Sequence, residues 1–151
     1  MEKQKAKYIY GLQESQFRRY MEEAFKTPGV SGIILLGSLE RRLDNVIFSL
    51  GFADSRKQAR QIVLHGHFRV NVSKVDIPSY QVKVGDVITW KESVKSTGFF
   101  KDRTDGIPKR PVPAWLELDK TDMSGRVLAL PGVEDLQKGI DSRLIVEFYS
   151  R

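Results

Sequence analysis

Apolar residues in the first part of the chain recur at helical spacing. Phe17, Met21 and either Ala24 or Phe25 are three or four residues apart, which places them on one face of a helix. Gly11 interrupts this pattern. We therefore predict two consecutive helices whose aromatic face packs into a core.

A longer apolar run follows, and it predicts one continuous helix over residues 31–50. Ser31 stands at its start as a candidate N-cap, and Gly51 stands at its end. Gly37 is a weak point within it, because glycine is a poor helix former. We expect this helix to join two structural regions.

Another helix is predicted immediately after Asp54. Either Asp54 or Ser55 supplies its N-cap, since both side chains accept hydrogen bonds from free backbone N–H groups. Ala59, Ile62 and Val63 then share one face at helical spacing. This face is expected to be buried.

Gly66 and the residues after it predict the end of that helix and the start of strands. Glycine suits the left-handed conformation that ends many helices. Phe68, Val70 and Val72 alternate with polar residues, which is the spacing of a half-buried strand. Further turns are expected at residues 71–75 and 84–86, and a further strand at residues 87–90.

The pattern weakens after residue 90. We expect a loop or a broken helix over residues 91–110, because glycines and a proline interrupt it. Within it we interpret Phe99 and Phe100 as a local anchor in preference to a base-stacking platform. Strands are predicted over residues 115–118 and 126–130.

The last segment is ambiguous from its pattern alone. Residues 144–148 are rich in residues that favour strands. Asp141, however, could cap a helix that runs through Tyr149. Both interpretations remain open at this point.

Positive charge is concentrated in the middle of the chain. The formal net charge is +6, and residues 41–110 hold fourteen Lys and Arg against seven Asp and Glu. Such a localised excess attracts a polyanion. No basic helix with bulky apolar residues indicates a membrane instead, and no apolar run is long enough for a membrane span or a secretory signal. We expect a cytoplasmic protein.

Candidate catalytic and metal sites are few. The chain has no cysteine, which excludes disulfides and thiolate ligands. His65 and His67 lack a third ligand cluster, so we expect them near phosphate or carbonyl groups, with no metal and no cofactor. Arg42-Leu43-Asp44 resembles the Arg-Leu-Asp of pseudouridine synthases, but Thr-Ser-Gly does not follow. We expect Asp44 to be a surface or interface carboxylate and the protein not to be an enzyme.

The basic residues of the central helix and hairpin are the best functional candidates. A solvated charged face is an equally weighted interpretation of the pattern alone. Arginine favours phosphate binding, because its planar fork can hold two phosphate oxygens. The cations concerned are Arg56, Lys57, Arg60, Arg69 and Lys74.

This stretch resembles the S4-type RNA-binding domain, and within that superfamily the chain is similar to the bacterial ribosomal small-subunit protein four family. The similarity is collinear over almost the whole chain. It also rests on residues 39–46, residues 110–117 and the terminal segment of residues 144–151.

The resemblance implies an α+β fold. A discontinuous helical domain would comprise residues 1–43 and 124–151, with the terminal segment as a short helix packed on the N-terminal helices. An inserted S4-type domain, residues 44–123, would pack helices on an antiparallel sheet.

The resemblance also implies a structural constituent of the small ribosomal subunit that binds 16S-type rRNA early in 30S assembly and influences translational accuracy. Its implied partners are the 5′ domain of that RNA, the neighbouring small-subunit protein five and mRNA near the path by which it enters the subunit. A stand-alone S4-domain stress protein is the alternative.

Candidate RNA-binding residues are carried over from the resemblance. They are Arg41, Arg42, Ser55, Arg56, Lys57, Arg60, Gln61, His65, Gly66, His67, Arg69, Asn71, Lys74 and Tyr80.

The sequence departs from the family pattern at two places. Members commonly have a further basic N-terminal region, often with zinc-binding cysteines, and we expect its RNA contacts and its zinc to be missing here. Members also have Val-Asn-Gly in the hairpin, where this chain has Asn71-Val72. Because glycine adopts positive φ at low cost, we expect a different or strained turn.

Overall fold

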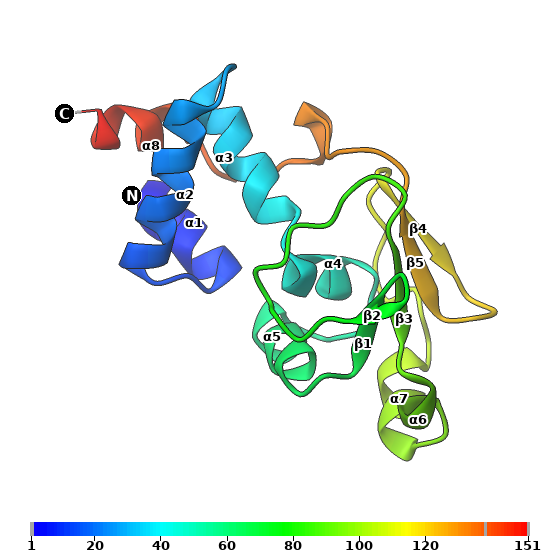
Figure 1. Ribbon diagram of the computed structural model, residues 1–151. Coiled ribbons are helices and arrows are strands. Elements are labelled where there is room, and N and C mark those ends of the chain that lie inside the picture. The colour runs from blue at the N-terminus through cyan, green and yellow to red at the C-terminus, as the bar shows by residue number, and fades with distance from the viewer. Residues whose placement is uncertain (1, 138, 151) are drawn as a thin grey trace. The chain divides into compact units, whose positions relative to one another are not determined.

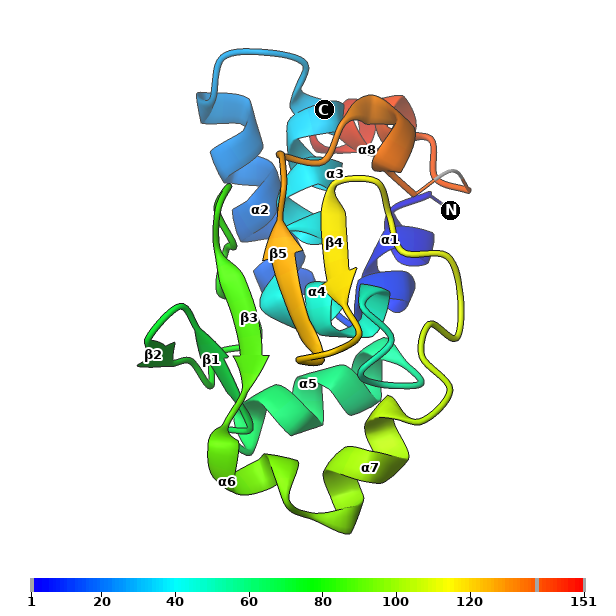
Figure 2. The same ribbon diagram turned by 90° about the vertical axis from the view of Figure 1, so that its right-hand side faces the viewer.

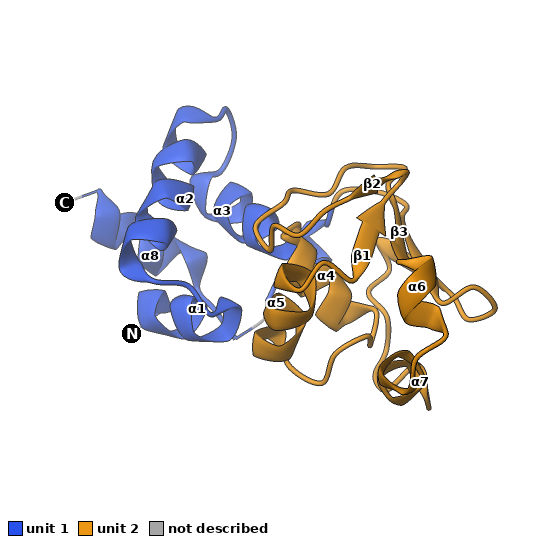
Figure 3. Ribbon diagram, turned by 60° about the horizontal axis from the view of Figure 1, so that its bottom comes forward, with its two compact units in different colours: residues 1–40, 131–151 blue, residues 41–130 orange. Residues whose placement is uncertain are grey.

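The computed structural model describes residues 2–137 and 139–150. The chain divides into two compact units, which Figure 3 colours separately: residues 1–40 with 131–151, and residues 41–130. The predicted α+β class is confirmed. No helix in these described residues has the length and apolar character needed to cross a membrane. Arg151, part of the terminal motif, lies outside the described residues.

The first unit is helical. It contains α1 (Glu2–Tyr10), α2 (Glu14–Lys26), α3 (Ser31–Glu40), a 3₁₀ turn (Val133–Asp135) and α8 (Ser142–Tyr149) (Figure 1). The predicted break near Gly11 is confirmed. So is the helical alternative for the last segment, since the Asp141 carboxylate accepts a hydrogen bond from the Arg143 N–H at 3.0 Å. Ile145 of α8 belongs to the same buried core as Phe17 and Leu39.

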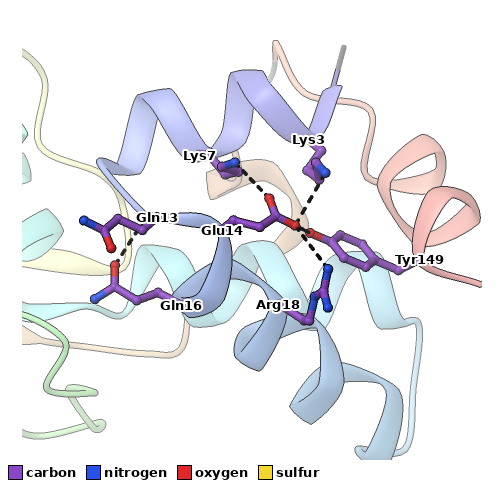
Figure 4. Close-up of polar contacts among 7 residues, drawn as sticks. All are labelled: Lys3, Lys7, Gln13, Glu14, Gln16, Arg18 and Tyr149. Carbon is purple, nitrogen blue, oxygen red and sulfur yellow. Dashed lines mark hydrogen bonds and ion pairs between the residues drawn. The ribbon is translucent and has the colours of Figure 1, made fainter.

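The Glu14 carboxylate ties α1 and α2 to α8 (Figure 4). It accepts hydrogen bonds from the Lys7 ammonium at 2.8 Å and from the Tyr149 hydroxyl at 3.0 Å. Lys3 and Arg18 lie 3.5 Å and 3.8 Å from it. These partners, Lys7 above all, lower the pKa of Glu14 to about 2. The charge on Glu14 therefore stabilises the packing of α8.

We expect the variant Glu14→Gln to weaken the acid dependence of folding. Because the folded-state pKa lies below the ordinary value of 4.5, the stabilisation is present above about pH 4.5 and is lost as the pH falls towards 2. The variant should be about 1 kcal/mol less stable at pH 7, since solvent screens this half-exposed site, and equal to the parent near pH 2. Far-UV circular dichroism during urea unfolding at several pH values measures this.

Glu23→Gln is the matched control, because Glu23 makes only an exposed 4.0 Å pair with Lys26. It should leave the pH profile unchanged. Parallel profiles for Glu14→Gln and the parent protein would refute the role of Glu14.

The second unit is a five-stranded antiparallel sheet with helices on one face (Figure 2). The strand order is β2-β1-β3-β5-β4. Its elements are α4 (Leu43–Ser49), α5 (Arg56–Leu64), β1 (Phe68–Val70), β2 (Ser73–Lys74), β3 (Val87–Trp90), α6 (Glu92–Lys95), α7 (Gly98–Thr104), β4 (Leu116–Asp119) and β5 (Ser124–Val127).

Helices α4 and α5 bury their apolar faces against one side of this sheet. The predicted inner face of α5, Ala59, Ile62 and Val63, is confirmed as buried. On β3, Ile88 and Trp90 point into the same core, and Val87 and Thr89, which alternate with them, are only partly covered. The other face of the sheet is polar, which is typical of an antiparallel sheet covered on one side.

The predicted continuous helix over residues 31–50 is wrong. Helix α3 ends at Glu40 and α4 begins at Leu43, so the break falls at Arg41-Arg42 rather than at Gly37. The cause is tertiary: the N–H groups of Leu43 and Asp44 donate to carbonyls of residues 80 and 78 instead of to the preceding turn. Residue 31 is also the first residue of α3 rather than its N-cap.

Two strand predictions need corrected bounds. Strand β1 ends at Val70, because Val72 lies in the turn with 87% of its surface exposed. Strand β5 covers residues 124–127 instead of 126–130, and it pairs with both β3 and β4. Residues 124–130 therefore pack with the sheet-containing unit, whereas the resemblance assigned them to the helical domain. Over residues 91–110 the broken-helix alternative is confirmed by α6 and α7.

Candidate RNA-binding surface

All of the net positive charge lies in the sheet-containing unit. Residues 41–130 hold sixteen Lys and Arg against ten Asp and Glu, whereas the helical unit holds nine of each. The excess of +6 is thus confined to one folded unit. A polyanion is attracted to this unit more than to the other.

Helix α5 presents a polar stripe opposite its buried face. Of the two predicted N-caps, Asp54 and Ser55, the structure has Ser55, whose hydroxyl accepts a hydrogen bond from the Gln58 N–H at 3.0 Å. Lys57, Gln61 and His65, at intervals of four, are all exposed. Arg60 is half-buried beside them.

The hairpin after α5 adds two opposed cations. Arg69 and Lys74 face each other across β1 and β2, and both are exposed. Like charges placed opposite one another destabilise a sheet unless an anion lies between them. This pair therefore favours an anionic partner.

Gly66 joins the helix to the hairpin in the predicted left-handed conformation, with a φ of 76°. A β-carbon at this position would lie 2.7 Å from Cε of Lys74. The absence of a side chain thus lets the Lys74 chain cross the end of α5. Gly66 thereby leaves room for the Lys74 side chain at the end of α5.

The hairpin turn places Asn71, and not a glycine, in the left-handed region. Asn71 adopts a φ of 57°, a conformation that asparagine tolerates better than most residues. Its amide nitrogen donates to Asp86 at 3.1 Å, and its amide oxygen accepts from the Val87 N–H at 3.0 Å. The Asn71 side chain is engaged in holding the hairpin to β3.

Arg42 is buried, which corrects its assignment as an RNA-binding residue. Its side chain is 2% exposed and donates two hydrogen bonds to Asp44, at 3.1 Å and 3.0 Å. Asp44 is buried too, so of the two roles predicted for it, surface or interface carboxylate, the surface role is wrong. Both oxygens of Asp44 accept bonds from Arg42, and one also accepts from the Asn45 N–H at 2.7 Å. The pair supports the α3–α4 break.

Arg56 is largely occupied by the fold. Its Nε donates to Asn45 at 2.8 Å, and its guanidinium carbon lies 4.5 Å from the centre of the Phe48 ring. The guanidinium of Arg110 lies 3.8 Å from the same ring. Burial, followed by the neighbouring Arg56, lowers the pKa of Arg110. The two arginines fix the corner between α4 and α5.

A set of contacts around Asp54 was not predicted from the sequence. Asp54 accepts a hydrogen bond from Lys109 at 2.7 Å and pairs with Arg103 at 3.5 Å. The Lys109 hydrogen bond is the main reason for the lowered pKa of Asp54. The contact holds residues 98–110 against the start of α5. No sequence signal marked it, because the partners are about 50 positions apart.

Three other candidates lie near the edge of this region. Arg41 is half-buried and donates to the Val82 carbonyl at 3.1 Å. Tyr80 packs partly against the core, and burial raises its pKa. His67 is half-buried beside His65, with ring centres 6.1 Å apart.

We call the exposed and half-exposed polar residues of α5 and of the hairpin the α5–hairpin surface; the Lys74 side chain, close to Gly66, connects the two elements. It consists of Lys57, Arg60, Gln61, His65, His67, Arg69 and Lys74.

Two protein families match this chain in consecutive segments. The Ribosomal protein S4/S9 N-terminal domain matches residues 1–40, and the S4 domain matches residues 41–88. The second match contains α5 and the hairpin, which carry the α5–hairpin surface. The first covers α1 to α3 of the helical unit.

Comparison with curated proteins gives matches over almost the whole chain. The small ribosomal subunit protein uS4 of Heliobacterium modesticaldum is 56% identical over 150 residues, which cover 99% of this chain and 72% of that protein. Those of Persephonella marina and Acetivibrio thermocellus are 51% and 54% identical over 150 residues, with 99% of this chain and 73% and 72% of those proteins covered. The chain therefore belongs to the small ribosomal subunit protein uS4 family.

Proposed function

We propose that this chain binds small-subunit ribosomal RNA through the α5–hairpin surface and acts as a structural part of the small ribosomal subunit. The observation that carries the proposal is the exposed cross-strand pair of Arg69 and Lys74, whose Lys74 side chain lies close to Gly66 at the end of α5. These residues lie within the segment that matches the S4 domain.

The chemistry of the surface suits recognition of RNA shape. The major groove of an RNA helix is too deep and narrow for side chains to read, so proteins contact phosphates and 2′-hydroxyls. Cations supplied by a helix and by a hairpin can meet phosphates of two different strands. Gln61 adds a neutral group that can donate to or accept from a ribose hydroxyl.

The finer role rests on the resemblance to relatives. We propose docking at a junction of helices in the 5′ domain of 16S-type rRNA early in 30S assembly, with influence on translational accuracy. We also propose contacts with protein five of the small subunit and with mRNA near the path by which the mRNA enters the subunit. Arg41, Arg56, Asn71 and Tyr80 then act chiefly by supporting the surface, because their side chains hold other parts of the fold.

We expect the double variant Lys57→Ala/Arg69→Ala to bind rRNA at least about tenfold more weakly at low salt. A protein with fewer cations neutralises fewer phosphates and therefore releases fewer counterions from the RNA when it binds. The slope of log affinity against log salt should fall by about 2. Stability should stay within about 0.5 kcal/mol, since both side chains are exposed. Filter binding at several salt concentrations measures both.

Lys5→Ala/Arg19→Ala in the helical unit is the charge-matched control. It removes the same charge from exposed positions outside the surface and should change the slope less. An equal loss of RNA affinity in both double variants would show that total charge, and not the α5–hairpin surface, determines binding.

Competition binding tests the specific proposal. The full chain is bound to a folded 5′-domain rRNA fragment, and a perfect RNA duplex of equal length serves as competitor at several salt concentrations. Strong preference for the folded fragment supports recognition of a junction. Equal, steeply salt-dependent affinity for both RNAs would refute it.

A further inference from the structure

Phe99 and Phe100 have separate environments, although they are adjacent in the sequence. The Phe100 ring packs edge-on to Trp90, with ring centres 5.3 Å apart, and joins the core of the unit. This confirms Phe100 as a local anchor. Phe99 lies in the first turn of α7 and keeps 40% of its surface exposed.

The exposed Phe99 ring lies beside the α5–hairpin surface. Its centre is 5.1 Å from that of the His67 ring, and the two planes differ by 31°. His67 is in turn 6.1 Å from the His65 ring at the end of α5. Three rings from two segments that are distant in the sequence are thus neighbours.

Cations surround these rings. The guanidinium carbon of Arg103, four residues further along α7, lies 5.7 Å from the centre of the Phe99 ring, within the range of a cation–π contact. Burial first, and then the charges of His65 and Lys91, lower the pKa of His67. The lowered pKa favours the uncharged form of the His67 ring.

The helix that carries Phe99 is held in place by a cap at its start and by ion pairs at and after its end. The Thr97 hydroxyl caps the helix by accepting from the Phe100 N–H at 3.2 Å. Arg103 and Lys109 pair with Asp54, which joins the segment to the start of α5. An aromatic ring held in this way loses little conformational freedom when a ligand stacks on it.

We propose that Phe99 and His67 form a stacking platform for an unpaired RNA base at the edge of the α5–hairpin surface. The inference rests on the proposed rRNA binding and adds to it a contact with a base. Bases stack on aromatic rings in single-stranded RNA because every base has a π-face, and nearby cations hold the backbone. The platform requires α7, which lies outside the segment matched by the S4 domain.

The experiment measures the coupling between the Phe99 ring and RNA bases. The full chain and its Phe99→Leu variant are titrated with an octamer of adenylates and with an octamer of abasic ribose phosphates of equal charge. For the adenylate octamer we expect an affinity loss of about fivefold or more in the variant. For the abasic octamer the two proteins should bind equally, and the salt slope should not change, because no charge is removed.

Phe148→Leu is the matched control. Phe148 is also 40% exposed and has the Lys3 ammonium 4.1 Å from its ring centre, but it lies in the unit without net charge. It should bind both octamers like the parent protein. The variant Phe99→Trp should keep or increase affinity for adenylates.

The outcomes separate this inference from the proposed function. Equal adenylate affinity in Phe99→Leu and the parent overturns the platform, even if the 5′-domain fragment is still preferred over duplex. Equal losses in Phe99→Leu and Phe148→Leu overturn it as well. The proposed function is tested separately, by the competition experiment: it is overturned if the parent protein binds the 5′-domain fragment no more tightly than the duplex.

Discussion

Removing the buried carboxylate of Asp44 should destabilise the sheet-containing unit by about 3–5 kcal/mol. In Asp44→Ala, the Arg42 guanidinium would remain buried with 2% exposure and without the two hydrogen bonds it now donates to Asp44. A buried charge that loses its ion partner is costly because the interior solvates it poorly. The break between α3 and α4 also loses its support.

Tryptophan fluorescence during urea unfolding measures this effect in the unit concerned. Both tryptophans of the chain, Trp90 and Trp115, are buried within residues 41–130. Asp54→Ala is the control, because that carboxylate is 60% exposed and its removal should cost at most about 1 kcal/mol. A loss below 1 kcal/mol in Asp44→Ala would contradict the expectation.

A second variant keeps the test informative if Asp44→Ala does not fold. Replacing both partners, as in Arg42→Met/Asp44→Leu, removes the two buried charges together. Apolar pairs of similar volume often substitute for a buried ion pair at little cost. This double variant should therefore be more stable than Asp44→Ala, and equal or lower stability would argue against unpaired charge as the cause.

Gly66→Val should impair folding and RNA binding together. A β-branched residue at a φ of 76° is strained, so we expect a loss of about 1–3 kcal/mol, and the flexible Lys74 side chain would have to move away from its present position. Displacement of Lys74 from the end of α5 should also lower affinity for rRNA by about fivefold or more. Urea unfolding and filter binding measure the two effects.

Gly66→Ala and Gly85→Ala separate backbone strain from the displacement of Lys74. Gly85 has a φ of 89°, but no atom lies within 4 Å of the place where its β-carbon would be. Both alanine variants should lose about 1–2 kcal/mol of stability. Only Gly66→Ala should bind RNA more weakly, and equal RNA affinities would exclude a role for the Lys74 position.

Local features of the structure were predictable because they depend on near neighbours in the chain. Ser55 caps α5 because a hydroxyl accepts a bond from a free N–H three residues later, and Gly66 ends the helix because glycine adopts positive φ easily. The buried face of α5 follows from the helical period. Lys57 and Gln61, on the opposite side, are exposed for the same reason.

Other features depended on partners distant in the sequence. The pattern of residues 31–50 favours one helix, but carbonyls of residues 78 and 80 accept the N–H groups of Leu43 and Asp44 and break it. The terminal segment became a helix because its Asp141 cap and its packing outweighed its β-prone residues.

The sequence by itself thus determined the cap, the buried face and the end of α5, the family and the concentration of charge in one part of the chain. Only the tertiary structure decided which cations remain accessible. Arg42 and Lys57 are both basic, yet the first is buried against Asp44 and the second lies in solvent. The same holds for Phe99, which faces His67 at 5.1 Å because the folding of α7 brings the two together. Burial and long-range proximity arise from packing, which no short stretch of sequence specifies.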